Sequence, residues 1–200
     1  MLTSPAGLVL AAGGGRRLGR PKALVAIAGV RLVDLATATL RAGGCEPLLV
    51  VSGATPLEVP GASVVHNRDW RTGLGSSLRA GLGGLPPGAQ AVVVTPVDTP
   101  RVDAVVVHRL VAAWRSGAQV AVATYAGARH TPVLLARPHW AEAAARAEGD
   151  QGARAFLAAH PELVTDIECA DLGPWLDLDT PSDLARYRAE LRDHHGTRGE

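Results

Sequence analysis

The sequence predicts an α/β fold, a doubly wound and mostly parallel sheet with helices on both faces, in a three-layer α/β/α arrangement. Short apolar runs recur along the chain at residues 8–10, 48–51, 91–94 and 120–123. Each run is rich in valine or leucine and is bounded by glycine, proline or serine, which is typical of strands buried on both faces. Helical patterns lie between the runs, and this alternation favours a parallel sheet.

The elements follow one another in a regular order until about residue 125. Helices are expected over residues 32–42, 76–85 and 102–114, followed by a strand over 131–136 and helices over 140–147 and 152–160. Thr180 and Pro181 predict the start of a last helix, with threonine as N-cap and proline at the first helical position. We expect a single domain over residues 1–193 and a polar C-terminal tail over 194–200.

Composition limits the function classes that need to be considered. The formal net charge of +1 gives no overall attraction to nucleic acid or membrane, so neither is an expected partner. Cys45 and Cys169 show no metal-binding spacing, and they are predicted to be buried free thiols in a reducing compartment. No basic leader and no apolar run of about 18 residues is present, so we expect a cytoplasmic protein.

A glycine-rich basic loop follows the first predicted strand and is the most informative segment. Residues 10–22 contain Gly13, Gly14, Gly15 and Gly19 together with three arginines and Lys22. Glycines let backbone N–H groups converge, and the cations add full positive charge, which suits a polyphosphate. The dinucleotide fingerprint fails at Leu18, and the P-loop motif fails because arginine and proline replace its lysine and hydroxyl residue. The loop therefore binds phosphate in a third way or is a plain strand-to-helix turn with solvated arginines.

Carboxylates after predicted strands offer a metal site. Asp98 follows the strand at 91–94 and is suited to Mg²⁺, although it could instead stabilise a turn before Thr99. Asp177 and Asp179 lie two apart on an extended segment and are expected to face opposite sides, so we expect only one of them to meet Asp98. We favour Asp179 because it directly precedes the last helix. The alternative is that this aspartate cluster only stabilises the helix start, for which Asp183 is sufficient.

Three further polar segments are candidates. Asn67 and Arg71 precede a helix expected to begin at paired serines, Ser76 and Ser77, which could bind an anion or a base, or could be ordinary capping by Ser76. The segments at 129–132 and 149–152 are each more typical of a turn than of a site when taken alone.

Taken together, these segments resemble the MobA-like nucleotidyltransferase family and, within it, the molybdenum cofactor cytidylyltransferases. The opening pattern L-A-A-G-x-x-x-R-x-G-x-P-K-x-L is matched over residues 10–24, and N-x-x-W-x-x-G-x-x-x-S-L-x-x-G over 67–81. The D-x-P element lies at 98–100, the G-D-x-G-A-R element at 149–154 and the D-x-D-T-P-x-D-L element at 177–184. The usual G-H-P before the strand reads His130-Thr131-Pro132 here.

The resemblance implies transfer of CMP from CTP to molybdopterin with release of pyrophosphate, with Mg²⁺ as cofactor and an apo-molybdoenzyme as a further partner. It implies catalytic roles for Lys22, Arg17 and Asp98, and a metal site at Asp98 and Asp179. Acceptor contacts are implied for His130, Thr131 and Asp150. The implied nucleotide-binding residues are Leu10, Ala11, Ala12, Gly13, Gly14, Gly15, Arg16, Gly19, Lys22, Asn67 and Ser77.

The donor and acceptor remain open at this point. Ala11-Ala12 is similar to the cytidylyl branch, whereas Val97-Asp98-Thr99-Pro100 is nearer the guanylyl-transferring relatives. The alternatives are GTP as donor, another phosphorylated acceptor such as a sugar phosphate, a non-catalytic cofactor carrier and a nucleotide-sensing regulator. Intact Lys22, Asp98 and Asp179 argue against the carrier, because delivery alone needs no chemistry at the α-phosphate.

Overall fold

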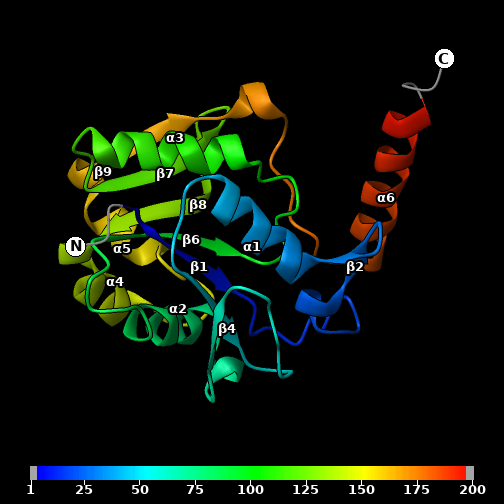
Figure 1. Cartoon of the computed structure of the whole chain (residues 1–200), viewed down its shortest axis with the longest axis horizontal. Helices are drawn as coiled ribbons and strands as arrows, with labels where there is room; N and C mark the ends of the chain where they lie inside the picture. Colours follow the sequence, from blue (N-terminus) through cyan, green and yellow to red (C-terminus); the bar gives the residue numbers. More distant parts are fainter. Residues whose placement is uncertain (1–3, 197–200) are drawn as a thin grey trace.

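A seven-stranded, mostly parallel sheet forms the centre of the molecule in the computed structural model, which describes residues 4–196 (Figure 1). The strand order is β5-β4-β1-β6-β8-β7-β9, and only β8 runs antiparallel to its neighbours. The strands are β1 (Ala6–Leu10), β4 (Leu48–Ser52), β5 (Ser63–His66), β6 (Ala91–Pro96), β7 (Val120–Tyr125), β8 (Ala128–Ala136) and β9 (Val164–Glu168). The predicted doubly wound α/β fold is therefore confirmed.

Helices cover both faces of this sheet. The α-helices are α1 (Leu32–Ala42), α2 (Leu74–Gly83), α3 (Ala104–Arg115), α4 (Trp140–Arg146), α5 (Arg154–Ala159) and α6 (Pro181–Gly196). Short 3-10 helices lie at Lys22–Leu24, Trp70–Thr72, Arg137–His139, Pro161–Leu163 and Ala170–Leu172. None of the helices within residues 4–196 is long and apolar enough to cross a membrane.

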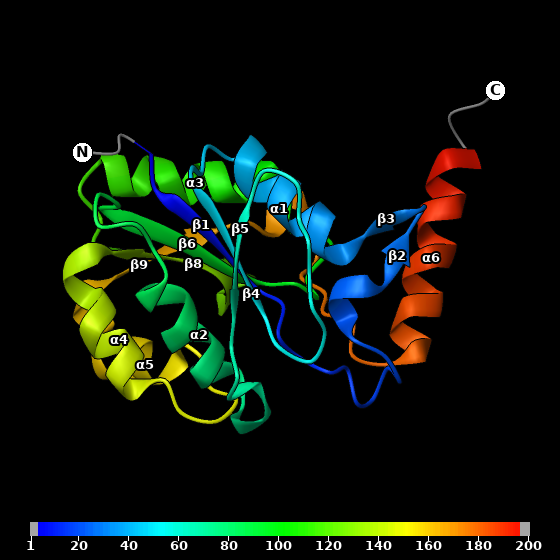
Figure 2. The ribbon, with the colours of Figure 1, turned by 60° about the horizontal axis from the view of Figure 1, so that its bottom comes forward.

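Two hydrophobic cores follow from the alternation of side chains along the buried strands. Val9 of β1 packs in the core under α1 and α3, whereas its neighbours Leu8 and Leu10 pack in the core under α2, α4 and α5. Successive side chains of a strand point to opposite faces, so a continuous apolar run supplies both cores. The two helical layers are separated by the sheet in Figure 2.

Helix α6 lies apart from these layers, beside a small hairpin of β2 (Ala26–Ile27) and β3 (Val30–Arg31) (Figure 2). Arg188 donates to the Ala26 carbonyl at 2.7 Å, and Leu184 and Tyr187 join the core that contains Ile27. The helix continues to Gly196, past the point where the polar tail was expected to begin at residue 194. Residues 197–200 of that expected tail lie outside the described residues.

Some element boundaries differ from the predictions for local reasons. Helix α2 begins at Leu74 rather than at the serines, because Gly73 precedes it and the Gly75 N–H is taken by the Gly149 carbonyl at 2.8 Å. Strands β5 and β9 were not predicted. They are edge strands with mostly exposed or half-exposed side chains, so they lack the continuous apolar pattern of the central strands.

Candidate active site

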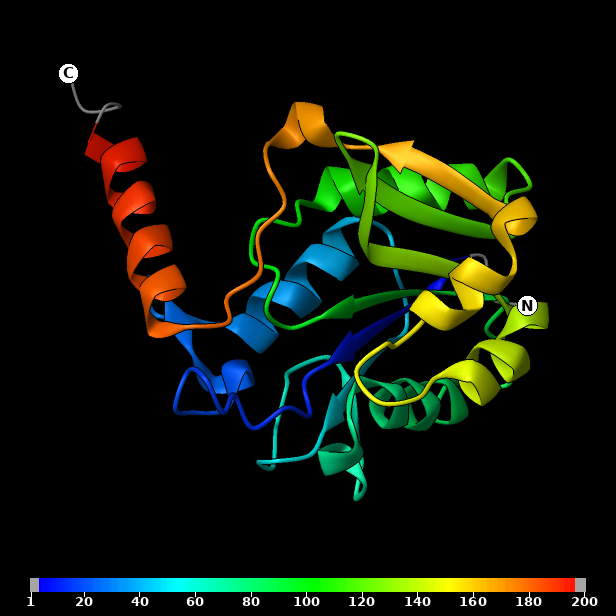
Figure 3. The ribbon, with the colours of Figure 1, turned by 180° about the vertical axis from the view of Figure 1, so that it is seen from behind.

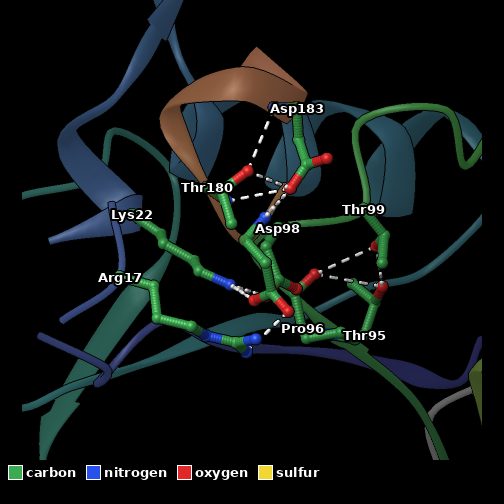
Figure 4. Close-up of polar contacts among 9 residues, drawn as sticks. Arg17, Lys22, Thr95, Pro96, Asp98, Thr99, Thr180 and Asp183 are labelled. Carbon is green, nitrogen blue, oxygen red and sulfur yellow. Dashed lines mark hydrogen bonds and ion pairs between the residues drawn. The ribbon is translucent and has the colours of Figure 1, made fainter. Parts of the chain in front are cut away.

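Three charged side chains meet where β1 and β6 end. Lys22 donates from Nζ to Asp98 Oδ2 at 2.6 Å and to Asp179 Oδ1 at 2.5 Å (Figure 4). Lys22 comes from the loop after β1, Asp98 from the turn after β6, and Asp179 from the segment before α6. Because β1 and β6 are parallel neighbours, their carboxyl ends bring the first two residues to one edge of the sheet. The predicted catalytic lysine and the two predicted metal-binding carboxylates thus form one cluster.

Arg17 extends this cluster toward solvent. Its Nη2 donates to Asp179 Oδ2 at 2.6 Å, and its side chain is 71% exposed, compared with 16% for Lys22. Exposed ion pairs are worth about 1 kcal/mol or less, so Arg17 can leave Asp179 at little cost. Lys22 is held more firmly, since it is half-buried and contacts two carboxylates.

The carboxylates keep Lys22 charged. Burial alone would lower its pKa, but the charge of Asp98 and the hydrogen bonds to Asp179 and Asp98 outweigh burial and raise the pKa above its ordinary value. The site therefore presents an ammonium group at neutral pH.

The position of Asp177 differs from the prediction, in which only one of Asp177 and Asp179 was expected to meet Asp98. Both line the same cavity as Asp98, and burial together with the negative charges of Asp179 and Asp98 raises the pKa of Asp177. Leu178 lies between them, is fully buried, and donates from its N–H to the Asp98 carbonyl at 2.9 Å. Residues two apart on an extended segment share a face, so both aspartates face the cavity while Leu178 packs in the core.

Local hydrogen bonds hold these aspartate-bearing segments in place. Thr180 donates from its N–H to Asp183 Oδ2 at 2.9 Å, and the Asp183 N–H donates back to Thr180 Oγ1 at 3.2 Å (Figure 4). This reciprocal arrangement confirms Thr180 as the N-cap of α6. On the other side, Thr99 Oγ1 donates to the Pro96 carbonyl at 3.2 Å and stiffens the turn that carries Asp98.

The glycine loop offers backbone donors beside the cluster. Within residues 4–196, the backbone N–H groups of residues 12–17 donate to no protein acceptor. Gly15 adopts a φ of +61°, and a Cβ at this position would lie 1.9 Å from the Arg20 carbonyl oxygen. Gly13, Gly19 and Arg16 are exposed, and Gly14 lies against the Trp70 ring. Unpaired donors and exposed cations on one loop are features that suit the binding of an anion.

Leu10, Ala11 and Ala12 form the buried base of this loop. Ala11 donates to the Val51 carbonyl at 3.0 Å, and the Ala12 carbonyl accepts from the Ala54 N–H at 2.9 Å. A Cβ added to Gly53 would come within 2.7 Å of Ala12 Cβ, so the alanine methyl group fills the space at the end of β1. Of these three residues, Leu10 lines the cavity.

Asn67 and Ser77 are not at the cavity wall. Asn67 Nδ2 donates to Ser76 Oγ at 2.9 Å and to Ser77 Oγ at 3.1 Å, and its Oδ1 accepts from the Asp69 N–H. All three side chains are at most 5% exposed. They tie the end of β5 to the first turn of α2, and the expected contact of Asn67 and Ser77 with a nucleotide stays a prediction.

A cavity of about 480 Å³ opens beside the charged cluster. The three expected acceptor residues, His130, Thr131 and Asp150, all line it. Burial and the nearby charge of Arg154 lower the pKa of His130, so its imidazole is neutral at neutral pH. The apolar part of the wall consists of Leu10, Leu74, Leu78, Val94, Val122, Val133 and Leu157. In the view from behind, the segment between β9 and α6 runs past the carboxyl ends of β6 and β1 (Figure 3).

Trp175 is a wall residue that the sequence did not single out. Its ring stacks on His130 with centroids 4.1 Å apart and planes 24° from parallel. Arg129, in a segment first interpreted as a turn, and Arg154, at the start of α5, also line the cavity. A tryptophan between a Gly-Pro pair and the aspartate motif was the signal available in the sequence.

Comparisons with known proteins identify similar sequences over at least 90% of this chain. Residues 7–164 match the family described as the MobA-like NTP transferase domain. The chain is 35% identical to nicotine blue oxidoreductase of Paenarthrobacter nicotinovorans, over 90% of this chain and 94% of that protein. It is 33% identical to a molybdenum cofactor guanylyltransferase of Rhodobacter capsulatus, over 94% of this chain and 97% of that protein.

Solved structures are similar over almost the whole chain. A homologue, from Mycobacterium sp. strain JC1, of a Mycobacterium tuberculosis protein superposes with a TM-score of 0.83 at 31% identity, covering 94% of this chain and 96% of that one. The Mycobacterium tuberculosis protein in complex with manganese gives a TM-score of 0.75 at 26% identity, covering 93% and 98%. The fold, the order of the motifs and these matches together show that the chain belongs to the MobA-like NTP transferase family.

Proposed function

We propose that this protein transfers a nucleoside monophosphate from a nucleoside triphosphate to the phosphate of a molybdopterin-type acceptor. The observation that carries the proposal is the Lys22 ammonium held between Asp98 and Asp179, beside a loop with unpaired N–H groups and a cavity large enough for a second substrate. The molybdenum cofactor guanylyltransferases among the relatives support this acceptor class.

The carboxylate pair fits a divalent cation. Asp98 and Asp179 lie 2.6 and 2.5 Å from the same ammonium nitrogen, so the pair already shares one cation between two oxygens. Within the part of the chain that the structure describes, no cluster of three or more acidic, histidine or cysteine side chains could hold a metal. Two carboxylates suit Mg²⁺, which usually completes its shell with water and phosphate oxygens. When bound, such an ion would supply the positive charge that offsets the triphosphate.

The chain's own residues account for the remaining requirements of the reaction. An oxygen of the acceptor phosphate attacks the α-phosphorus, the bond from the α-phosphorus to the bridging oxygen breaks, and pyrophosphate leaves. The loop N–H groups and Arg17 bind the β- and γ-phosphates, and Lys22 donates to the α-phosphate. Because the nucleophile is already an anion, catalysis consists of positioning and charge stabilisation.

CTP is the donor that we propose, although the curated relatives of this type are guanylyltransferases. The support for CTP is the Ala11-Ala12 pair, which is buried where β1 ends and is similar to the cytidylyl branch of the family. His130, Thr131 and Asp150 would contact the acceptor, and an apo-molybdoenzyme would receive the product.

Pyrophosphate release tests the proposal. The purified protein is incubated with Mg²⁺, molybdenum-loaded molybdopterin and CTP, GTP or ATP. We expect release to require the acceptor, to be fastest with CTP, and to fall by about 10²–10³ in Asp98→Ala. Asp171→Ala is the matched control, because Asp171 pairs with Arg109 away from the cavity. Faster release with GTP would reject the CTP assignment, and no release with any nucleotide would reject the proposed transfer.

A redox reaction in the same cavity is the second candidate, favoured by the 35% identity to nicotine blue oxidoreductase. Oxidation of NADH or NADPH, followed by absorbance with a heteroaromatic electron acceptor, tests it. Acceptor-dependent oxidation without any pyrophosphate release would favour this candidate over nucleotidyl transfer.

A further inference from the structure

Two polar atoms of the cavity wall have no partner. Thr131 Oγ1 and Trp175 Nε1 are both buried and form no hydrogen bond within the described part of the chain. Both residues line the 480 Å³ cavity. The third atom of this kind, His139 Nε2, belongs to a residue outside the cavity wall.

The fold brings these two residues to one patch through His130. His130 is the chain neighbour of Thr131 and stacks on the Trp175 ring at 4.1 Å. In the pairing of β7 with β8, Val122 lies opposite Val133 but Ala123 lies opposite His130, so Thr131 and Pro132 stand outside the regular ladder. Irregularities of this kind commonly redirect a side chain toward a site.

An unpaired buried donor is unfavourable for the folded protein, because the group loses its hydrogen bonds to water and gains none in return. The same chain avoids this at Trp140, whose Nε1 donates to the Leu135 carbonyl at 3.0 Å. Unpaired polar groups in native proteins call for an explanation, and a binding role is one such explanation. Here both residues line one cavity, which points to a ligand with hydrogen-bond acceptors on its edge.

The surroundings define the chemical class of that ligand. The wall is apolar at Leu78, Val94, Val133 and Leu157, and it contains the stacked His130–Trp175 pair. Flat apolar surfaces with one polar edge suit a planar heteroaromatic ring, because such rings stack on aromatic faces and present their nitrogen and oxygen atoms in the ring plane. Arg154 adds a cation to the wall, which suits an anionic substituent on the same molecule.

We propose that Thr131 and Trp175 recognise the edge of a planar nitrogen heterocycle in the acceptor, and that Trp175 is a specificity-determining residue of this protein. The identification of that heterocycle as a pterin rests on the proposed function. The hydroxyl of Thr131 and the indole N–H of Trp175 donate to ring acceptors, while the apolar side chains of the wall contact the ring face. A sugar phosphate, which lacks such a ring, binds this patch poorly.

Stability and binding measured on the same variants test the proposal. Thr131→Val removes the unpaired hydroxyl and keeps the shape. Trp175→Phe removes the unpaired N–H together with part of the ring, and Trp140→Phe, which makes the same truncation but removes a paired N–H, is the matched control. Binding of free pterin and of ribose 5-phosphate is measured by calorimetry, CTP binding is measured separately, and the melting temperature is taken without ligand.

We expect each cavity variant to weaken pterin binding about three- to tenfold, with CTP binding unchanged. Their melting temperatures should equal or exceed that of the wild type, whereas that of Trp140→Phe should fall by about 2–4 °C. The proposal is overturned if Trp175→Phe binds pterin as well as the wild type does, if it loses stability as Trp140→Phe does, or if ribose 5-phosphate binds the wild type better than pterin. Because no nucleotidyl transfer is measured here, pterin binding that depends on Trp175 in a protein that releases no pyrophosphate would reject the proposed function and leave this proposal standing.

Discussion

Lys22 shows how the charged residues of the site satisfy one another without ligands. Its ammonium and the Arg17 guanidinium neutralise the carboxylates of Asp98 and Asp179. The same carboxylates are the proposed metal ligands and the same cations are the proposed phosphate ligands. A metal ion at Asp98 and Asp179 would compete with Lys22 for these carboxylates and would leave Lys22 free to contact phosphate.

Lys22→Met should accordingly have opposite effects on metal binding and catalysis. We expect nucleotidyl transfer to fall by about 10²–10³, because one contact to the transition state is lost. Mn²⁺ affinity without nucleotide, measured by electron paramagnetic resonance, should rise by about tenfold or more because the competing ammonium is gone. Arg20→Gln removes the same charge from the same loop but leaves the Lys22 contacts intact. An equal rise in Arg20→Gln would show general charge repulsion instead of competition.

The structure and the sequence motif suggest different roles for Asn67. The structure indicates a packing contact, and the motif indicates direct contact with a nucleotide. Its side chain is 5% exposed and pairs with Ser76 and Ser77. Asn67→Ala should destabilise the fold by about 1–3 kcal/mol, because buried hydroxyls lose a partner, and should lower the melting temperature by about 2–4 °C per kcal/mol. Calorimetry measures both. An unchanged melting temperature with a raised KM for the nucleotide would instead support direct nucleotide binding.

Among the helices and strands, the elements with continuous or regularly spaced buried residues were the ones predicted correctly from the sequence. The strands β1, β4, β6 and β7 and the helix α1 were predicted close to their observed bounds, because their apolar patterns are continuous or regularly spaced. The edge strands β5 and β9 have mostly polar or exposed residues, so no pattern marked them. The start of α2 depends on a contact with Gly149, which lies far away in the sequence and is therefore invisible to local rules.

The glycine-rich loop at residues 10–22 provides a test of one such segment, namely whether its backbone conformation matters for nucleotide binding. Gly15→Ala would place a Cβ 1.9 Å from the Arg20 carbonyl at a φ of +61°, so the loop must move. Gly29→Ala, in the hairpin between β2 and β3, has a similar φ of +84° but nothing within 4 Å of the new Cβ. We expect Gly15→Ala to raise the KM for the nucleotide at least about tenfold and Gly29→Ala to leave it unchanged, by steady-state kinetics. Equal KM values for the two variants would contradict an ordered phosphate cradle.

Over the whole molecule, the topology brings together residues that lie more than 150 positions apart in the sequence. The order of the motifs along the chain was enough to identify these residues. Lys22, Asp98 and Asp179 were predicted as a group, and the structure places them in contact. The cavity and the place of Trp175 in its wall were not predictable from the sequence. Both depend on the path of the segment between β9 and α6, which runs past the carboxyl ends of β1 and β6. The shared face of Asp177 and Asp179 was missed because the side-chain alternation of an extended segment was misapplied to them.

Stability of the chain in acid should depend on Glu168. Its carboxylate accepts hydrogen bonds from the N–H groups of Ala170 and Gly127 and from Thr124, which holds its pKa below the ordinary value. A lowered folded-state pKa contributes stability above the unfolded pKa of about 4.3, and this contribution is lost as the pH falls through the folded value.

Glu168→Gln should therefore melt below the wild type at pH 7, and the difference should shrink as the pH falls below about 4.3. Calorimetric melting temperatures across this range measure the effect. A difference that stays constant with pH would show that the charge of Glu168 does not contribute.

The most direct test of the central claim follows the phosphorus atoms of CTP. The protein is incubated with molybdopterin and with CTP labelled either at the α-phosphorus or at the γ-phosphorus, and the products are separated by chromatography. We predict that the α label enters a molybdopterin dinucleotide while the γ label leaves in pyrophosphate. Transfer of the γ label to the acceptor, or its release as orthophosphate, would contradict the account, because the cluster around Lys22 would then serve a different phosphoryl reaction.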